Sequence, residues 1–381
     1  MKRREFLKKA GLGAAAGTAA GIAAPALAQT APTITWRMAS SFPKALDTIY
    51  GASEIIVKRV AEITEGKFQI RLFAGGEIVP GLQVLDAVQA GTVECGHTAP
   101  YYYIGKDPAF AFGTAIPFGM SARHQNAWMY YGGGLEAMAP LFKEYGCIQI
   151  PAGNTGTQMG GWFRKEIKTV ADLKGLKFRI GGFAGQVLAK LGVVPTQIAG
   201  GDIYPALEKG TIDAAEWVGP YDDEKLGFNK VAKFYYYPGW WEGGPQLSTL
   251  INEKKWAELP KHYQSALETA CAEANLHMLA RYDAKNPDAL RRLVGTGTQL
   301  RPFTQAVMEA CEKAAFELYE ETNAKSAHWK RIYPGWKKFR DDQFLWFRVA
   351  EHTYDRFIFG GGRGAGPAKG GAAKGGAAKK G

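Results

Sequence analysis

Arg179 is the clearest candidate for binding chemistry in the sequence. It ends an otherwise apolar run, Phe178-Arg179-Ile180, and two glycines follow shortly after it. An arginine at the end of a strand can hold a carboxylate through two parallel hydrogen bonds, because its guanidinium group is planar. A solvent-exposed arginine remains the alternative when this strand is considered alone.

Two glutamates lie in segments with few polar partners. Glu216 follows the small residues Ala214 and Ala215, and Glu242 lies in a loop rich in aromatic residues and glycine. A buried carboxylate is costly unless an arginine or a metal ion compensates its charge. Since Arg179 is one candidate cation for two glutamates, there is room for a second cation.

Gln158 can supply another oxygen ligand. It lies in a glycine-rich segment, Gly153–Trp162, that is expected to cross between two parts of the fold. Together with Glu216 and Glu242, its side chain offers hard oxygen atoms, which suit Na⁺ or Ca²⁺ better than a transition metal.

The common catalytic motifs are missing from the sequence. It contains no H-E-x-x-H, no G-x-S-x-G and no G-x-x-x-x-G-K-[ST]. His97 is expected to be structural, and the adjacent Cys95 is not expected to be a nucleophile. The four cysteines form no C-x-x-C pair, so we expect them to be free. A binding site is indicated, and a periplasmic enzyme with a cofactor is the alternative from another class.

The first part of the chain alternates strands and helices. We expect strands at 33–38 and 68–72, and helices at 49–64 and 81–90, each with the apolar spacing of its type. This order is typical of a parallel α/β sheet.

A similar cycle follows, and part of it repeats the first. The expected elements are strands at 148–150 and 177–180 and helices at 170–173, 185–191 and around 204–209. Residues 85–94 resemble residues 204–213, and each segment is followed by a short strand that leads to Pro-Tyr. We interpret this as two similar lobes with a ligand cleft at the carboxyl edges of their sheets. Coincidence between two common helix-Gly-strand units is the alternative.

The last third is mainly helical. We expect one or two long helices over 259–293, a strand at 299–303 and long helices over 307–359. The final helix is rich in aromatic residues, which either fill a core or pack on a partner subunit. These aromatic residues are Phe344, Trp346, Phe347, Tyr354, Phe357 and Phe359.

The charge of the chain is concentrated at its two ends. The formal net charge is +11, of which +4 lies in residues 1–28 and +5 in residues 360–381, leaving +2 for the body. Because the body is almost neutral, a nucleic-acid partner is not expected. No run after residue 30 approaches the ~20 apolar residues of a membrane span.

Both ends have recognisable compositions. Paired arginines, an apolar Ala/Gly stretch and Ala26-Leu27-Ala28 indicate a twin-arginine signal peptide over residues 1–28. Residues 360–381 repeat Gly, Ala and Lys and are expected to form a disordered basic tail.

These segments together resemble the extracytoplasmic solute-binding subunit of a tripartite ATP-independent periplasmic (TRAP) transporter. The resemblance is carried by Val170–Arg179 and Leu207–Trp217. The Glu216-Trp217 pair and the tyrosine-rich Pro100–Lys106 resemble the branch that binds 2-oxo monocarboxylates such as pyruvate. The resemblance implies a two-lobed α/β fold with long C-terminal helices.

The resemblance also implies roles for individual residues. Arg179 takes the position of a carboxylate-binding arginine, and Gln158 that of a residue contacting both ligand and cation. The implied cation ligands are Gln158, Glu216, Trp217 through its backbone carbonyl, and Glu242. The other implied ligand contacts are Trp217, Asn154, Tyr101 and Tyr102.

The expected domain organisation follows from these segments. Lobe I spans 29–152 with contributions from about 245–303, lobe II spans 153–244, and the C-terminal helices span 304–359. We expect a periplasmic protein that captures a 2-oxo monocarboxylate with Na⁺ and delivers it to membrane permease subunits. The alternatives are a lactate or other 2-hydroxy acid with Ca²⁺, and a secondary use in ligand sensing. A homodimer built by the C-terminal helices is also expected.

Overall fold

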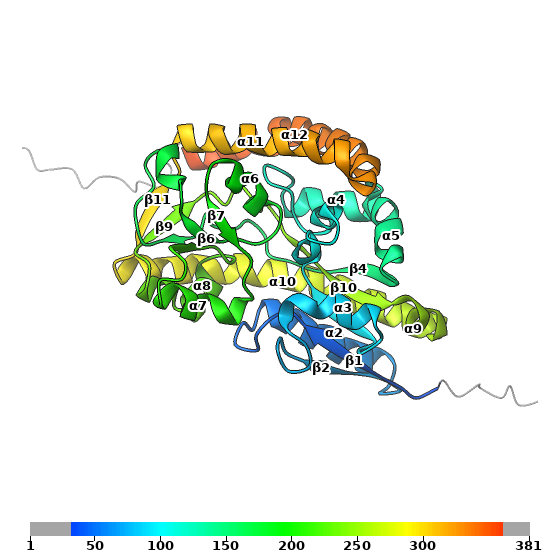
Figure 1. Ribbon diagram of the computed structural model, residues 1–381. Coiled ribbons are helices and arrows are strands. Elements are labelled where there is room, and N and C mark those ends of the chain that lie inside the picture. Colours follow the sequence, from blue (N-terminus) through cyan, green and yellow to red (C-terminus); the bar gives the residue numbers. More distant parts are fainter. Residues whose placement is uncertain (1–31, 361–381) are drawn as a thin grey trace, which may run out of the picture. The chain divides into compact units, whose positions relative to one another are not determined.

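The computed structural model describes residues 32–360, shown in Figure 1. Apart from the first residues of β1, the elements below belong to one compact unit that begins at Thr35. The signal peptide predicted over residues 1–28 and all of the predicted tail except Gly360 lie outside the described residues. None of the described helices is both long enough and apolar enough to cross a membrane.

Five strands form the first sheet, in the order β2-β1-β3-β10-β4. Their bounds are β1 Ile34–Ser40, β2 Phe68–Phe73, β3 Cys95–Thr98, β4 Cys147–Asn154 and β10 Gln246–Asn252. β1 pairs with β3 in parallel, as the strand and helix order predicts, but β10 runs antiparallel to β3 and β4. The prediction of a parallel sheet is therefore wrong at β10, because this strand enters from the second sheet.

Six strands form the second sheet, in the order β11-β9-β5-β8-β6-β7. Their bounds are β5 Trp162–Phe163, β6 Lys177–Arg179, β7 Val194–Thr196, β8 Ala214–Ala215, β9 Phe234–Tyr237 and β11 Gln299–Pro302. β6 is parallel to β7 and β8, and β11 is parallel to β9, whereas β5 is antiparallel to β8 and β9. β11 thus lies in the second sheet, although the sequence interpretation placed this segment with the first lobe.

Helices surround the two sheets (Figure 1). The α-helices are α2 Ile49–Ile63, α3 Val84–Gln89, α4 Ala122–Tyr131, α5 Gly134–Glu144, α6 Ala184–Lys190, α7 Gly200–Glu208, α8 Pro220–Leu226, α9 Glu253–Glu258, α10 Lys261–Gly295, α11 Gln305–Lys325 and α12 Ala327–Gly360. Short 3₁₀ helices are η1 Gly81–Gln83, η2 Pro100–Tyr103, η3 Pro108–Gly113, η4 Val170–Leu173 and η5 Phe228–Lys230. The long helices join the two parts. α10 packs on α2 and β4 of the first part and on α8 of the second. α11 packs on α6 and on α12, and α12 lies against α4 and α5.

Besides α9 and α10, which lead from β10 to β11, two chain segments cross between the sheets, one from β4 to β5 and one from β9 to β10. They are hydrogen-bonded to each other: Thr155 N donates to Pro245 O at 3.1 Å, and Gly239 N donates to Gln158 O at 3.1 Å. Gln158 N also donates to the backbone oxygen of Glu242 at 3.3 Å. The crossing predicted around Gln158 is present, and it places Gln158 beside Glu242.

The internal repeat is visible in the backbone. Gly91 and Gly210 both have φ of +71°, a left-handed conformation that glycine adopts without strain. The residues after them make matching hydrogen bonds, Thr92 N to Ala87 O at 2.9 Å and Thr211 N to Ala206 O at 3.0 Å. Each glycine is followed by a strand of its own sheet and then by a helix that begins at a proline, η2 or α8. The repeat is therefore structural rather than coincidental.

Candidate functional site

Arg179, at the carboxyl end of β6, is buried with a relative exposure of 1%. Its Nε donates to Ile198 O at 3.0 Å, and its Nη1 donates to Glu216 O at 2.6 Å. Nη1 also forms an ion pair with the Glu216 carboxylate, and the guanidinium carbon lies 5.1 Å from the Trp217 ring centre. A solvent-exposed arginine is thereby excluded.

Glu216 follows β8 and is fully buried. Its Oε1 accepts from the backbone N of Gly181 at 2.7 Å as well as from Arg179, whereas its Oε2 has no hydrogen-bond partner within residues 32–360. Burial raises the pKa of Glu216, and the Arg179 charge and the Gly181 N–H oppose that shift.

Glu242, in the crossing segment before β10, is also buried, and neither of its carboxylate oxygens has a hydrogen-bond partner in the described part of the chain. Burial and the nearby Glu216 raise the pKa of Glu242 well above its ordinary value. Arg179 and the Tyr101 hydroxyl act in the opposite direction, and this hydroxyl approaches Glu242 without hydrogen-bond geometry. Of the two buried carboxyl groups in the site, Glu242 has fewer hydrogen bonds from the described residues to offset its charge.

Gln158 is oriented by its neighbour Thr155, to whose Oγ1 its Nε2 donates at 3.1 Å. Its Oε1 is buried and has no partner among the described residues. Gln158, Glu216 and Glu242 together have four buried oxygen atoms without a hydrogen bond to any residue that the structure describes. Buried polar atoms are seldom left without partners, and hard oxygen atoms are the ligands that Na⁺ and Ca²⁺ require. The donor set fits such a cation.

Trp217 and Asn154 are held by other side-chain contacts. The Trp217 Nε1 donates to Asp222 Oδ2 at 3.3 Å, which fixes the indole ring beside Arg179. The Asn154 amide donates to Gly244 O at 3.0 Å and accepts from Gly156 N at 2.9 Å. The bond to Gly244 joins the two crossing segments, and the bond from Gly156 fixes the turn of Asn154's own segment.

Tyr101 and Tyr102 lie in η2 with their rings 5.1 Å apart. Both are buried, and burial raises the pKa of each phenol. The Tyr101 ring packs against the turn after β6, where a β-carbon at Gly182 would lie 2.1 Å from it. The φ of Gly182 is +64°, so glycine is required there for both space and conformation.

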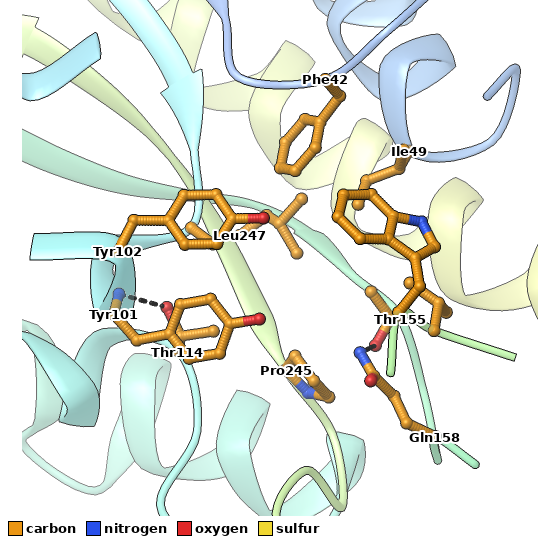
Figure 2. Close-up of a pocket in the computed structure, with 12 residues that line it drawn as sticks. Phe42, Ile49, Tyr101, Tyr102, Thr114, Thr155, Gln158, Pro245 and Leu247 are labelled. Atoms are coloured by element: carbon orange, nitrogen blue, oxygen red, sulfur yellow. Dashed lines mark hydrogen bonds between the residues drawn. The ribbon is translucent and has the colours of Figure 1, made fainter. Parts of the chain in front are cut away.

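A pocket of about 280 Å³ of empty space lies between these groups. Part of this space is open to solvent, and the volume within it that admits a water molecule is about 10 Å³, so the pocket is narrow. Figure 2 shows the Tyr101 and Tyr102 rings pointing into the pocket from one side, opposite Thr155 and Gln158. The lining residues are Phe42, Ile49, Ala99, Tyr101, Tyr102, Thr114, Thr155, Gln158, Trp217, Val218, Pro245 and Leu247.

The pocket lining thus contains Tyr101, Tyr102, Gln158 and Trp217 from the predicted set. Arg179, Glu216, Glu242 and Asn154 do not line it, and Arg179 lies against the Trp217 ring. Sequence reasoning missed the apolar wall, in particular Phe42 and the neighbouring Ile49, because such residues look the same in a core as in a pocket. It also missed the buried Asp222, although the repeat aligns Pro220-Tyr221-Asp222 with the predicted site segment Pro100-Tyr101-Tyr102.

His97 and Cys95 have structural environments. His97 is fully buried, its Nε2 lies 3.1 Å from Ala152 O, and burial lowers its pKa to about 4. Burial raises the pKa of the Cys95 thiol well above its ordinary value, which disfavours the nucleophilic thiolate. All four cysteines are buried and free.

Comparison with known proteins agrees with this geometry. The model of the family described as bacterial extracellular solute-binding protein, family 7, matches residues 39–326. The chain belongs to this family of TRAP solute-binding proteins. The family predicted from the sequence and its two-lobed α/β fold are confirmed.

Several relatives are similar over nearly their whole length. The monocarboxylate 2-oxoacid-binding periplasmic protein of a Nostoc species is 55% identical over 94% of this chain and 99% of its own. A solved TRAP solute-binding protein from Bordetella bronchiseptica, a dimer with calcium and picolinate in one site, is 56% identical, with a TM-score of 0.85 over 86% of this chain and 98% of its own. A third, from Pseudoalteromonas atlantica with bound sodium and pyruvate, is 41% identical, with a TM-score of 0.83 over 85% of this chain and 99% of its own.

Proposed function

We propose that this protein is the substrate-binding subunit of a TRAP transporter that captures a 2-oxo monocarboxylate of the size of pyruvate together with a cation. One observation carries the proposal: within residues 32–360, four buried oxygen atoms of Gln158, Glu216 and Glu242 have no hydrogen-bond partner, and the buried Arg179 lies near them. A cation bound to these oxygen atoms would compensate the cost of burying them.

Each site residue has a proposed role in binding. Glu216, Glu242, the Gln158 side-chain oxygen and the Trp217 carbonyl hold the cation. Arg179 already directs Nε and Nη1 to protein oxygens, so Nη2 is the nitrogen that meets the ligand carboxylate. Tyr101 and Tyr102 close the pocket around the ligand.

The nature of the cation follows from charge and from the relatives. A monocarboxylate and two glutamates against one arginine leave a net charge of −2, which Ca²⁺ neutralises fully and Na⁺ by half. Related proteins hold pyruvate with sodium or with calcium; the calcium example, from Colwellia psychrerythraea, is 40% identical. We therefore propose either ion, with the same four ligands.

We infer that the protein has no catalytic role. The pocket lining offers hydroxyl, amide and aromatic groups, whereas Cys95 and His97 lie outside it. Its expected partners are the membrane permease subunits of the transporter, and its expected location is the periplasm, reached through the twin-arginine signal over residues 1–28.

We also propose a homodimer built by α12. Several large apolar residues along this helix are more than half exposed in the single chain. They include Leu345, Trp346, Val349, Tyr354 and Phe359, whereas Phe344 and Phe347 pack on His124. An exposed apolar stripe of this kind is typical of a subunit interface.

A direct test measures binding after chelator treatment. Pyruvate, 2-oxobutyrate and lactate are titrated by calorimetry into the protein with Na⁺, Ca²⁺ or neither. We expect tight binding of the 2-oxo acids that requires one of the cations. Equal binding in cation-free buffer would refute the cation site. Tighter binding of lactate would show that the ligands are 2-hydroxy acids rather than 2-oxo acids. No binding of any of the three acids would refute the proposed function.

A further inference from the structure

Asp47 lies in the loop of residues 41–48 between β1 and α2, next to the pocket wall. Phe42, in this loop, and Ile49, which follows it, both line the pocket. The Phe42 ring contacts the Trp217 ring edge-to-face at 6.4 Å and lies 6.5 Å from the Tyr102 ring. The loop therefore contributes Phe42 to the pocket wall, directly after β1 of the first sheet.

The Asp47 side chain is a hub for three donors that come from other elements. The Tyr221 hydroxyl donates to Asp47 Oδ2 at 3.2 Å, and Lys225 forms an ion pair with the same carboxylate. Both residues lie on α8, which follows β8 of the second sheet. Arg281, on α10, pairs with the Asp47 carboxylate and donates from Nη1 to the Asp47 backbone oxygen at 2.8 Å.

We propose that Asp47 is a positioning residue for ligand retention: it fastens the 41–48 loop to α8 and α10 and thereby slows the escape of a bound ligand. The inference rests on the proposed function, since it assigns a role in retaining the ligand of the same site. Asp47 does not touch the pocket, so it acts through Phe42 and Ile49.

The electrostatic character of this hub gives it a distinctive signature. The side chains of Asp47, Lys225 and Arg281 are 39%, 29% and 32% exposed, so salt screens their attraction. The Arg179–Glu216 pair of the site is buried and is screened much less. Another bridge near the pocket is neutral: the Gln197 amide donates to Tyr102 O at 2.9 Å and accepts from Gly182 N at 3.3 Å. A salt-dependent dissociation rate would therefore report on the Asp47 hub.

Asp47→Asn is the variant of choice. It removes the charge but keeps the shape and the hydrogen bond between Arg281 and the Asp47 backbone oxygen. Lys225→Met removes a partner from the other side of the hub. Glu224→Gln is the matched control, because Glu224 lies on α8 and pairs with Arg292 of α10 without contact to the loop.

The experiment loads each protein with pyruvate and a saturating cation and follows release by stopped-flow tryptophan fluorescence. Ionic strength is varied with choline chloride at a constant cation concentration. We expect Asp47→Asn and Lys225→Met to raise the dissociation rate about 3- to 10-fold, corresponding to a partly exposed charge cluster. Asp47→Asn should also lose the salt dependence of the wild-type rate, and Lys225→Met should reduce it, because the Arg281 pair remains. Glu224→Gln should keep the wild-type behaviour.

Dissociation from Asp47→Asn at the wild-type rate and with the wild-type salt dependence would overturn the inference. An unfolding temperature that falls while release is unchanged would assign Asp47 to stability alone. Should Asp47→Asn not fold, Lys225→Met decides by the same two criteria. A wild-type protein that binds no pyruvate would overturn the proposed function and this inference with it, whereas a binding wild type with unaltered variants would overturn only the inference.

Discussion

Arg179 donates from Nη1 to both the backbone oxygen and the carboxylate of Glu216, so the residue proposed to hold the ligand already holds a proposed ligand of the cation. Ligand and cation therefore interact with the same set of buried charges. Binding of a cation at Glu216 relieves Arg179 of a neutralising role and strengthens its attraction for the ligand carboxylate.

Arg179→Ala should lose pyruvate binding by roughly 30-fold or more, equivalent to ~2–5 kcal/mol for a buried charge-assisted contact. It should also destabilise the fold by about 3–5 kcal/mol, because Glu216 is left buried without its ion pair. In the Arg179→Ala/Glu216→Gln double variant the stability should recover while binding stays lost. Calorimetry and urea unfolding on the three proteins separate the two effects, and near-native pyruvate affinity in either variant would contradict the assignment.

Glu242→Gln and Glu216→Gln should weaken the cation and the ligand together. Each substitution removes a charged oxygen ligand, and we expect a loss of about 10-fold or more in both affinities. Linkage requires that, in each protein, the cation raises the ligand affinity by the same factor as the ligand raises the cation affinity. Glu258→Gln, at an exposed glutamate of α9, is the control; a variant that loses only one of the two affinities would show that the two sites are separate.

Gly182→Ala should reduce ligand affinity by forcing the Tyr101 ring out of place. The added methyl group would meet the ring at 2.1 Å, and φ of +64° adds about 1 kcal/mol of strain. Gly175→Ala is the matched control, since Gly175 has φ of +73° but nothing within 4 Å of its β-carbon position. Equal affinities in the two variants would mean that the contact between Gly182 and Tyr101 is irrelevant to binding.

His97 should make the fold sensitive to acid. Its pKa falls from 6.5 to about 4 on burial, so the folded state binds the proton less tightly than the unfolded state. The free energy of unfolding is therefore unaffected by this group above pH ~6.5. It falls by about 3 kcal/mol as the pH decreases toward ~4. Urea unfolding of His97→Gln should show a smaller loss of unfolding free energy over this pH range than the wild type. Subtracting the two pH profiles removes the contributions of other titrating groups. Parallel pH profiles would contradict the prediction.

Val349→Glu should convert the proposed dimer into a monomer without unfolding it, because Val349 is 66% exposed in the single chain. Leu276→Glu is the control, since Leu276 is 70% exposed but lies on α10. Light scattering of both variants and of the wild type gives their molar masses in solution and thus their oligomeric states. A wild-type monomer at micromolar concentration would refute the dimer.

Local patterns predicted most of the elements, and residue chemistry predicted the charged part of the site. β1, α2 and β2 follow from apolar periodicity, and Arg179 with its two glutamates follows from the cost of burying charge. The antiparallel pairing of β5 with β8 and β9, and of β10 with β3 and β4, was not predictable in this way, because it depends on residues far apart in the chain. The pocket wall at Phe42 was missed for a similar reason: an apolar side chain carries no local sign of facing a ligand.

Strand β10 lies between β3 and β4, although the whole segment from β5 to β9 intervenes in the sequence. Until residues 246–252 have been synthesised, β3 and β4 each have an unpaired edge, and such edges pair readily with other chains. The first sheet therefore closes late, through contacts of long sequence separation that slow folding. A nascent chain that stops before β10 has an open sheet exposed to aggregation, and a fragment ending at β9 should not yield a stable first lobe.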